Sequence, residues 1–295
     1  MKETTKGHLF ALISIILWGT SFIATKELLQ AFTATQIMCM RFFVATAAAW
    51  VICPGWHFNL KEDIKFLLLA LLANTLYFVA ENNALARTQA SNVSILIATE
   101  PMMAVIILRL MKKSGRLAHH QTIGMITAFL GVILVVLNGT MYLHLSPAGD
   151  LLAIAAAVIW ALYGILLDAY FKGFSNAFVT RKMMFYGLIT ALPLLFLEGK
   201  TVDLGYLVSS GGIFYVIYLG IACGAVCYIT WSGAVRILGN IRANVYMYGI
   251  PLVTLVAGYF VLHERITPMG LAGIVLVLAG MVISSGIKKN SEKSD

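Results

Sequence analysis

The sequence has few charged residues for its length. Asp, Glu, Lys and Arg together make up 12% of the 295 residues, whereas hydrophobic residues make up 60%. The mean hydropathy is +0.88, and a soluble domain of this length does not require so much apolar sequence. The shortage of charge therefore argues against a water-soluble globular protein and favours a membrane protein.

The sequence also lacks the motifs that mark most enzymes and metal sites. It contains no phosphate-binding glycine-rich loop, no nucleophile elbow and no cluster of His and Cys with zinc-binding spacing. Its six histidines lie at or beyond the ends of the apolar runs. We therefore expect a protein that is not an enzyme and that uses no cofactor or metal ion. The four cysteines are interpreted as small buried residues in a reduced protein: Cys39, Cys53, Cys223 and Cys227.

Ten long apolar runs, joined by short connections, make up most of the chain. About 20 residues of helix, rising ~1.5 Å each, cross the ~30 Å hydrocarbon core of a bilayer, and each run is close to this length. The sequence therefore predicts an all-α, polytopic membrane protein with ten transmembrane helices. The runs lie at roughly 8–28, 34–53, 64–85, 90–110, 121–138, 149–171, 177–197, 212–234, 241–262 and 268–287.

The positive charges predict how the chain is oriented. Most of the 21 Lys and Arg residues fall in every second connection and in the two terminal segments. Cytoplasmic connections of membrane proteins carry an excess of Lys and Arg, so we expect a cell-membrane protein with both termini in the cytoplasm. This placement also accounts for the net charge of +8, and we expect no nucleic-acid partner.

The ten runs divide into two similar sets of five. Pro101 and Pro251 lie 150 residues apart near the middle of the fourth run of each set, and Trp18 and Trp160 lie 142 residues apart in the first run. A pair of glycines seven residues apart recurs in the fifth run of each set: Gly124 and Gly131, then Gly273 and Gly280.

Because five is odd, consecutive copies must enter the membrane from opposite sides. The sequence thus predicts two inverted five-helix repeats, over residues 1–142 and 143–295. This architecture is typical of secondary transporters, in which interrupted helices at matching positions indicate a substrate site near the middle of the membrane.

A series of short motifs resembles a known family. The motifs are Ile16-Leu17-Trp18-Gly19-Thr20, Met40-Arg41-Phe42-Phe43, the joints Ala84-Leu85-Ala86 and Ala234-Val235-Arg236, and a closing pattern from Pro251-Leu252-Val253 through His263-Glu264-Arg265 to Gly273 and Gly280. In order and spacing they resemble the drug/metabolite transporter superfamily, in its ten-helix EamA-type branch, over nearly the whole chain. The first half departs from the pattern, with Lys113-Ser114-Gly115 in place of the His-Glu-Arg motif. The resemblance implies a carrier of small metabolites, often an exporter, that works by alternating access and is built from two EamA-like repeats.

Candidate substrate-binding residues lie on shared faces of the predicted helices. Ser14, Trp18, Ser21 and Thr25 recur at helical spacing on the first span, on a polar face that should look into the bundle. We predict that Trp18 and Trp160 line a central cavity; the alternatives are core packing for the rings and helix–helix hydrogen bonds for the hydroxyls. Matching faces of the third and eighth spans add further candidates: Asn74, Phe78 and Glu81, and Gly224, Tyr228 and Trp231.

Charged residues within the predicted spans are the strongest functional candidates. A carboxylate such as Glu100 at the bilayer centre costs roughly 2.5–3.5 kcal/mol on insertion scales, so its default interpretation is functional. Arg41 and Glu81 both lie toward the outer ends of their spans, where a structural ion pair is the simplest explanation. Glu100 has no basic residue at comparable depth, which makes it the candidate for binding an amine and for carrying a coupling proton.

Three further residues complete the predicted site. Tyr248 lies one helical turn before Pro251 and is expected at the level of Glu100, as a substrate-binding residue. Pro101 and Pro251, together with Arg41, are expected to have structural or hinge roles, because a proline in a span removes one backbone donor.

The sequence therefore predicts a secondary transporter in the lipid bilayer with a small-molecule substrate. An acid among aromatic side chains suits an amine, and a zwitterion fits if Arg41 or a broken helix end receives its carboxylate. We expect export of amino-acid-like or amine metabolites by alternating access, with protons as the candidate coupling ion. The alternatives are a multidrug transporter of organic cations and a passive channel, whose pore should carry repeated polar rings.

Overall fold

The computed structural model describes residues 3–55, 57–87, 90–111, 119–137, 146–171, 173–261 and 267–285. Within these ranges every regular element is a helix, which agrees with the predicted all-α class. In chain order they are α1 (Glu3–Leu28), α2 (Ala34–Ile52), α3 (Leu60–Ala70), the π-helical turn η1 (Leu71–Leu76), α4 (Tyr77–Arg87), α5 (Ala90–Ile97), α6 (Glu100–Leu110), α7 (His119–Leu137), α8 (Pro147–Tyr170), α9 (Asn176–Glu198), α10 (Leu204–Ser209), α11 (Gly212–Gly220), the π-helical turn η2 (Ile221–Val226), α12 (Cys227–Leu238), α13 (Asn240–Asn244), the 3-10 turn η3 (Val245–Tyr248), α14 (Gly249–Val261) and α15 (Pro268–Ser285).

Six stretches of helix in the described ranges are long and apolar enough to cross a membrane. These stretches are Glu3–Leu28, Ala34–Ile52, Leu60–Arg87, Pro147–Leu167, Asn176–Glu198 and Gly212–Leu238. Two shorter apolar stretches lie in α7 and α15, at His119–Leu134 and Pro268–Ser284. The remaining two predicted runs, the fourth and the ninth, are interrupted helices.

Each interruption lies close to the proline that marks the run in the sequence. A two-residue turn separates α5 from α6, and Pro101 lies in the first turn of α6. In the ninth run, α13 passes through η3 into α14, and Pro251 is the third residue of α14. A proline is compatible with the first turn of a helix because the N–H groups there have no intrahelical acceptor. Each proline therefore starts a half-helix at the break.

Two π-helical turns occur at equivalent places in the two halves. They are η1 and η2, which begin and end 150 residues apart, the separation that also relates the two prolines. A π turn contains more residues than an α turn and so changes which side chains face one way. As a result Asn74 turns toward α9, where its Nδ2 donates to the Met183 carbonyl at 2.8 Å, and does not share the face of Phe78 and Glu81.

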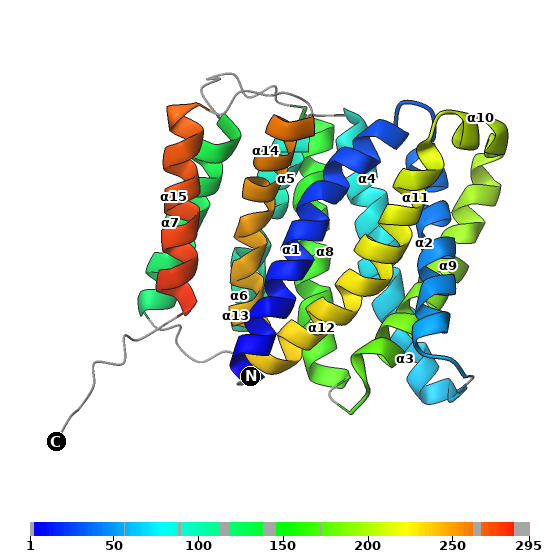
Figure 1. Cartoon of the computed structure of the whole chain (residues 1–295). Coiled ribbons are helices and arrows are strands. Elements are labelled where there is room, and N and C mark those ends of the chain that lie inside the picture. The colour runs from blue at the N-terminus through cyan, green and yellow to red at the C-terminus, as the bar shows by residue number, and fades with distance from the viewer. Residues whose placement is uncertain are drawn as a thin grey trace.

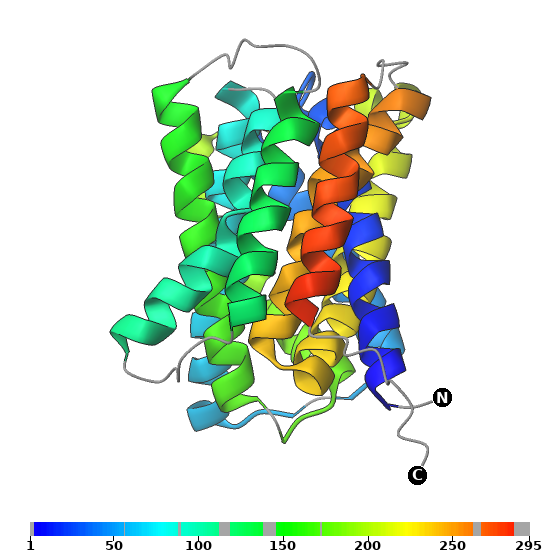
Figure 2. The same cartoon turned by 90° about the vertical axis from the view of Figure 1, so that its left-hand side faces the viewer.

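The helices α7 and α15 pack in opposite directions with backbone in direct contact. A Cβ added to Gly131 would lie 2.5 Å from the backbone nitrogen of Val277 and 2.8 Å from the carbonyl oxygen of Gly273. At the other end of the contact, a Cβ on Gly124 would lie 2.7 Å from the carbonyl oxygen of Gly280. The repeated glycines thus face each other across the pair, which stands at one edge of the bundle (Figures 1 and 2).

Helices from the two predicted halves alternate in space. In Figure 1, α1 lies beside α12 and α14, while α2 lies beside α9 and α11, and these neighbours are in contact. In both views α1 begins and α15 ends on the same side of the bundle, which we call the basal end. The opposite side, where α2 begins and α9 ends, is called the far end. The polar face predicted for α1 does point inward, since all four of its members are buried: Ser14, Trp18, Ser21 and Thr25.

Candidate functional site

A cavity opens among helices of both halves, toward the far end of the bundle. The empty space in it, including space open to solvent, is about 320 Å³. It is lined by Trp18, Ser21 and Phe22 of α1, Arg41 of α2, Tyr77, Phe78 and Glu81 of α4, Trp160 of α8, Met247 of η3 and Ile250 of α14.

Aromatic rings form most of the wall. The ring centroids of Trp18 and Trp160 lie 5.2 Å apart, nearly at right angles, and Tyr77 lies 4.8 Å from Trp160. Tyr228 and Trp231 pack behind Trp18, with centroids 5.9 and 5.4 Å away, and do not line the cavity. The predicted aromatic residues therefore form one cluster, in which some members can contact a ligand and others hold the first group in place.

The two π turns hold this cluster by equivalent carbonyl groups. Trp18 Nε1 donates to the Cys223 carbonyl of η2 at 3.1 Å, and the Tyr228 hydroxyl donates to the Ala73 carbonyl of η1 at 3.2 Å. Ala73 and Cys223 are 150 residues apart, so each half anchors an aromatic residue of the other half. Trp160 Nε1, the counterpart of Trp18 Nε1, has no hydrogen-bond partner in the described part of the chain.

Two opposite charges, Arg41 and Glu81, face the cavity without forming the predicted ion pair. Both residues are buried, and no guanidinium nitrogen of Arg41 comes within 4.0 Å of a carboxylate oxygen of Glu81. The guanidinium carbon of Arg41 instead lies 4.1 Å from the ring centroid of Phe78, and Arg41 Nε has no hydrogen-bond partner. Glu81 interacts with Arg41 through Coulomb attraction and with the neighbouring Tyr77. The cavity thus presents a cation and an anion that form no ion pair with each other, so both can bind a ligand.

Glu100 lies away from this cavity, at the break between α5 and α6. It is fully buried, and its Oε1 accepts a hydrogen bond of 2.7 Å from Nδ2 of Asn244, at the end of α13. Its other oxygen, Oε2, has no hydrogen-bond partner among the described residues, and neither has the hydroxyl of Tyr248. Tyr248 lies close enough to Glu100 for a Coulomb interaction between the two side chains. The acid predicted at the bilayer centre therefore joins the breaks of the two interrupted helices, and neither Glu100 nor Tyr248 lines the cavity.

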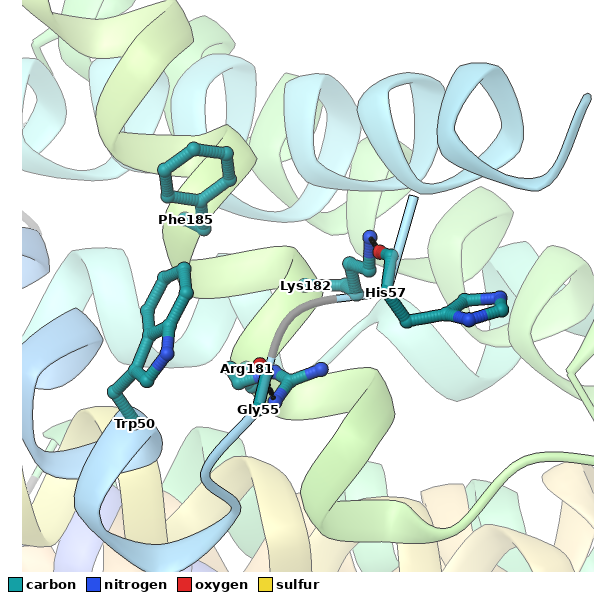
Figure 3. Close-up of a pocket in the computed structure, with 6 residues that line it drawn as sticks. All are labelled: Trp50, Gly55, His57, Arg181, Lys182 and Phe185. Atoms are coloured by element: carbon teal, nitrogen blue, oxygen red, sulfur yellow. Dashed lines mark hydrogen bonds between the residues drawn. The ribbon is translucent and has the colours of Figure 1, made fainter. Parts of the chain in front are cut away.

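The basal end carries a second group of buried charges, shown in Figure 3. Lys182 Nζ lies 2.6 Å from Asp63 Oδ1 and also donates to the His57 carbonyl. The preceding residue, Arg181, donates from Nη1 to the carbonyls of Cys53 and Gly55, at 2.7 and 2.5 Å. These bonds tie α9 to the connection between α2 and α3 at the basal end.

The structure brings together some predicted residues and adds others. Trp18, Ser21, Phe78, Glu81 and Trp160 all line the cavity, and Arg41 joins them. The added lining residues are Phe22, Tyr77, Met247 and Ile250, and the added charged pair is Lys182 with Asp63. Arg181 and Lys182 both lie within the predicted span 177–197, and two cations in one span indicate that an acid lies nearby. In the described part of the chain, no group of three or more His, Cys, Asp or Glu could hold a metal ion.

Comparison with known proteins gives relatives of the same length. An uncharacterized transporter of Archaeoglobus fulgidus is 27% identical over 290 residues, which cover 95% of this chain and 98% of the relative. A probable amino-acid metabolite efflux pump of Escherichia coli is 24% identical, over 95% of this chain and 94% of the pump. A probable terminal-alkyne amino-acid exporter of Streptantibioticus cattleyicolor is also 24% identical, over 92% and 90%.

A solved structure with a similar fold and a family model also match this chain. A solved crystal structure superposes with a TM-score of 0.76 at 16% identity, covering 94% of this chain and 96% of that one, which supports the fold alone. The family model of EamA-like transporters matches residues 5–137 and 147–286. With its apolar helices, the protein is a multi-pass membrane protein with a small-molecule substrate, and its relatives are transporters rather than enzymes. The chain belongs to the EamA-like transporter family.

Proposed function

We propose that the protein is a secondary transporter that exports small amino-acid-like metabolites across the cell membrane by alternating access. The observation that carries this proposal is the cavity with both Arg41 and Glu81 at its wall and no direct bond between them. A zwitterion offers a carboxylate for the guanidinium and an ammonium group for the carboxylate. The names of two relatives, an amino-acid metabolite efflux pump and an amino-acid exporter, support this substrate class.

The proposed architecture has ten spans in two inverted five-helix repeats, with residues 1–142 and 143–295 as the two units. The equal separation of the π turns and the reciprocal glycine contact of α7 with α15 support it. The family match over 5–137 and 147–286 supports the division between the units. The Lys and Arg distribution supports a cytoplasmic basal end, with both termini in the cytoplasm.

Glu100 is proposed to carry the coupling proton. A buried carboxylate with one free oxygen can exist with or without a proton, whereas one in a direct ion pair is held in its charged form. Its bond to Asn244 joins the two interrupted helices, where transporters of this architecture change shape. A change of protonation at Glu100 would therefore act on both halves together.

A second candidate substrate class is organic cations, and the aromatic wall with Glu81 favours it. Reconstituted protein distinguishes the two classes. Proteoliposomes loaded with one compound are tested for counterflow with a panel of labelled amino acids and quaternary ammonium compounds, with and without a pH gradient. Saturable counterflow of amino acids supports the proposal. Counterflow restricted to cations would select the second class, and ion conduction without saturation would indicate a channel.

A further inference from the structure

Arg181 is a buried charge without an acidic partner. Its side chain is buried, with only 3% of the residue exposed, and among the described residues no carboxylate oxygen lies within 4.0 Å of its guanidinium. The next residue, Lys182, is as deeply placed but has Asp63 at 2.6 Å. A buried charge that lacks a counterion is unfavourable by several kcal/mol. The contrast between the two neighbours therefore points to an anion that does not belong to the described residues.

The guanidinium of Arg181 has an edge left over for such an anion. Only Nη1 makes hydrogen bonds within the described chain, to two backbone carbonyls. The Nε and Nη2 groups remain, and a guanidinium edge of this kind donates two parallel bonds to a phosphate or carboxylate. Carbonyl dipoles hold the side chain in place and do not neutralise its charge.

A cavity lies beside Arg181. It has an empty volume of about 230 Å³ and is lined by Trp50, Gly55, His57, Arg181, Lys182 and Phe185. Figure 3 shows the rings of Trp50 and Phe185 on one side, while the His57 ring is turned outward. The two rings are 5.4 Å apart, and the guanidinium carbon of Arg181 lies 5.5 Å from the Trp50 centroid. One wall is therefore apolar and the other is cationic.

The surroundings of the cavity favour a lipid as the source of the anion. The nearby connection and helix ends expose large apolar side chains, with exposed fractions from 48% to 82%: Val51, Ile52, Phe58 and Leu60. In a membrane protein, such side chains beside a tryptophan at a helix end mark the level at which acyl chains meet head groups. Of the acids in the connection and first turn of α3, all of them described, Asp63 is bonded to Lys182, and Glu62 lies 3.3 Å from His57 and does not line the cavity.

We propose that the Arg181 cavity binds the phosphate of an anionic phospholipid from the leaflet at the basal end. Arg181 Nε and Nη2 bind the phosphate oxygens, and Trp50 and Phe185 contact the glycerol and the first acyl carbons. Basic pockets between transmembrane helices are a recurrent form of lipid head-group site. Because Arg181 also holds the carbonyls of Cys53 and Gly55, a bound lipid would stiffen the connection between α2 and α3.

The test is made on the full-length protein in detergent, with phosphatidylglycerol or phosphatidylcholine added at equal concentration. Native mass spectrometry measures the bound lipid, and a thermal melt measures stabilisation. We expect phosphatidylglycerol to be retained and to raise the melting temperature, and phosphatidylcholine to do neither. Arg181→Gln should weaken phosphatidylglycerol binding about tenfold, the equivalent of about 1.4 kcal/mol. Lys61→Gln, at an exposed lysine of the same end, should leave it unchanged.

A second variant decides the matter if Arg181→Gln does not fold. His57 borders the cavity and its side chain is 56% exposed, so His57→Glu adds a negative charge at the rim of the cavity while the bonds of Arg181 stay intact. This variant should also lose phosphatidylglycerol binding. Equal retention of the two lipids by the wild-type protein, or unchanged binding by His57→Glu, would overturn the proposal. Inorganic phosphate that stabilises as well as phosphatidylglycerol at the same concentration would overturn the lipid as the source.

Discussion

The two ends of the bundle hold their buried acids in different ways. At the basal end, Asp63 lies 2.6 Å from Lys182, and the Arg181 and Lys182 side chains donate to backbone carbonyls of the connection around them. At the far end, Glu81 and Arg41 line a cavity and make no direct contact. An acid that is paired with a lysine has little left to offer a ligand, whereas charges kept apart around a space can bind one. The comparison indicates that Asp63 has a structural role at the basal end, whereas the charges at the far end are available to a ligand.

The largest expected effect concerns Glu100, the acid between the two ends. Glu100→Gln keeps the size and the hydrogen-bonding ability of the side chain but cannot release a proton at the working pH. We therefore expect pH-driven accumulation of substrate to be abolished, while exchange at equal pH on both sides survives. The measurement is uptake by proteoliposomes with and without a pH gradient. Accumulation by the Gln variant at the wild-type level would rule out the coupling role.

The next effect is on stability, at the basal end. Removing one partner of a buried ion pair leaves an uncompensated charge, so Asp63→Asn or Lys182→Gln should lower the free energy of unfolding by about 3–5 kcal/mol. The double variant should recover part of this loss. Thermal melts in detergent measure the change, with Glu62→Gln as the control because its pair with His57 is exposed. An Asp63 variant as stable as the Glu62 variant would contradict a structural role for the Asp63–Lys182 ion pair.

The backbone contact between α7 and α15 should give an intermediate effect. At Gly131 an alanine Cβ would lie 2.5 Å from a backbone nitrogen, which cannot move aside as a flexible side chain can. Gly131→Ala should therefore destabilise the protein by about 1–3 kcal/mol, although alanine is the better helix former. Gly173→Ala is the matched control, because nothing lies within 4 Å of its added Cβ. Equal melting temperatures for the two variants would show that the helices do not pack this closely.

The smallest predicted effect compares equivalent tryptophans of the two halves. Trp18→Phe removes the bond to the Cys223 carbonyl, whereas Trp160→Phe removes an N–H that has no partner. The two substitutions delete the same ring area, so the Trp18 variant should be less stable by about 1 kcal/mol, the net value of one hydrogen bond. Thermal melts of both variants test this difference. A Trp160 variant less stable than the Trp18 variant would contradict the difference in hydrogen bonding between the two tryptophans.

The sequence was sufficient for the helical class and for the inward face of α1, because hydrophobic runs and helical spacing depend on local order along the chain. It indicated interruptions at Pro101 and Pro251 but not that a half-helix begins at each proline, since where a helix breaks depends on neighbouring helices. The sequence did not predict the π turns either. They shift Asn74 out of the face predicted for it, and only packing against α9 reveals this.

Pairing of charges was the hardest feature to predict. Arg41 and Glu81 were expected to meet because both are near the outer ends of their spans, yet Arg41 lies over Phe78 instead. Asp63 fell just outside a predicted span, so its burial against Lys182 was missed. Glu100 was expected to lack a basic partner, and its partner is an amide, Asn244, from the other half. Such contacts join residues far apart in sequence, and apolar periodicity carries no information about them.

The most direct test of the central claim compares Arg41→Gln with Glu81→Gln in counterflow assays with an amino acid and with a quaternary ammonium compound. If the two charges bind the two ends of a zwitterion, each variant should lose amino-acid counterflow by about 10–100-fold, as expected for a charged hydrogen bond. Any cation counterflow should be lost only in Glu81→Gln. The controls are Arg87→Gln, at an exposed residue of the same end, and Glu27→Gln, at a half-buried one outside the cavity; both should transport normally. Amino-acid counterflow at the wild-type rate in both cavity variants would contradict the assignment of this cavity as the substrate site.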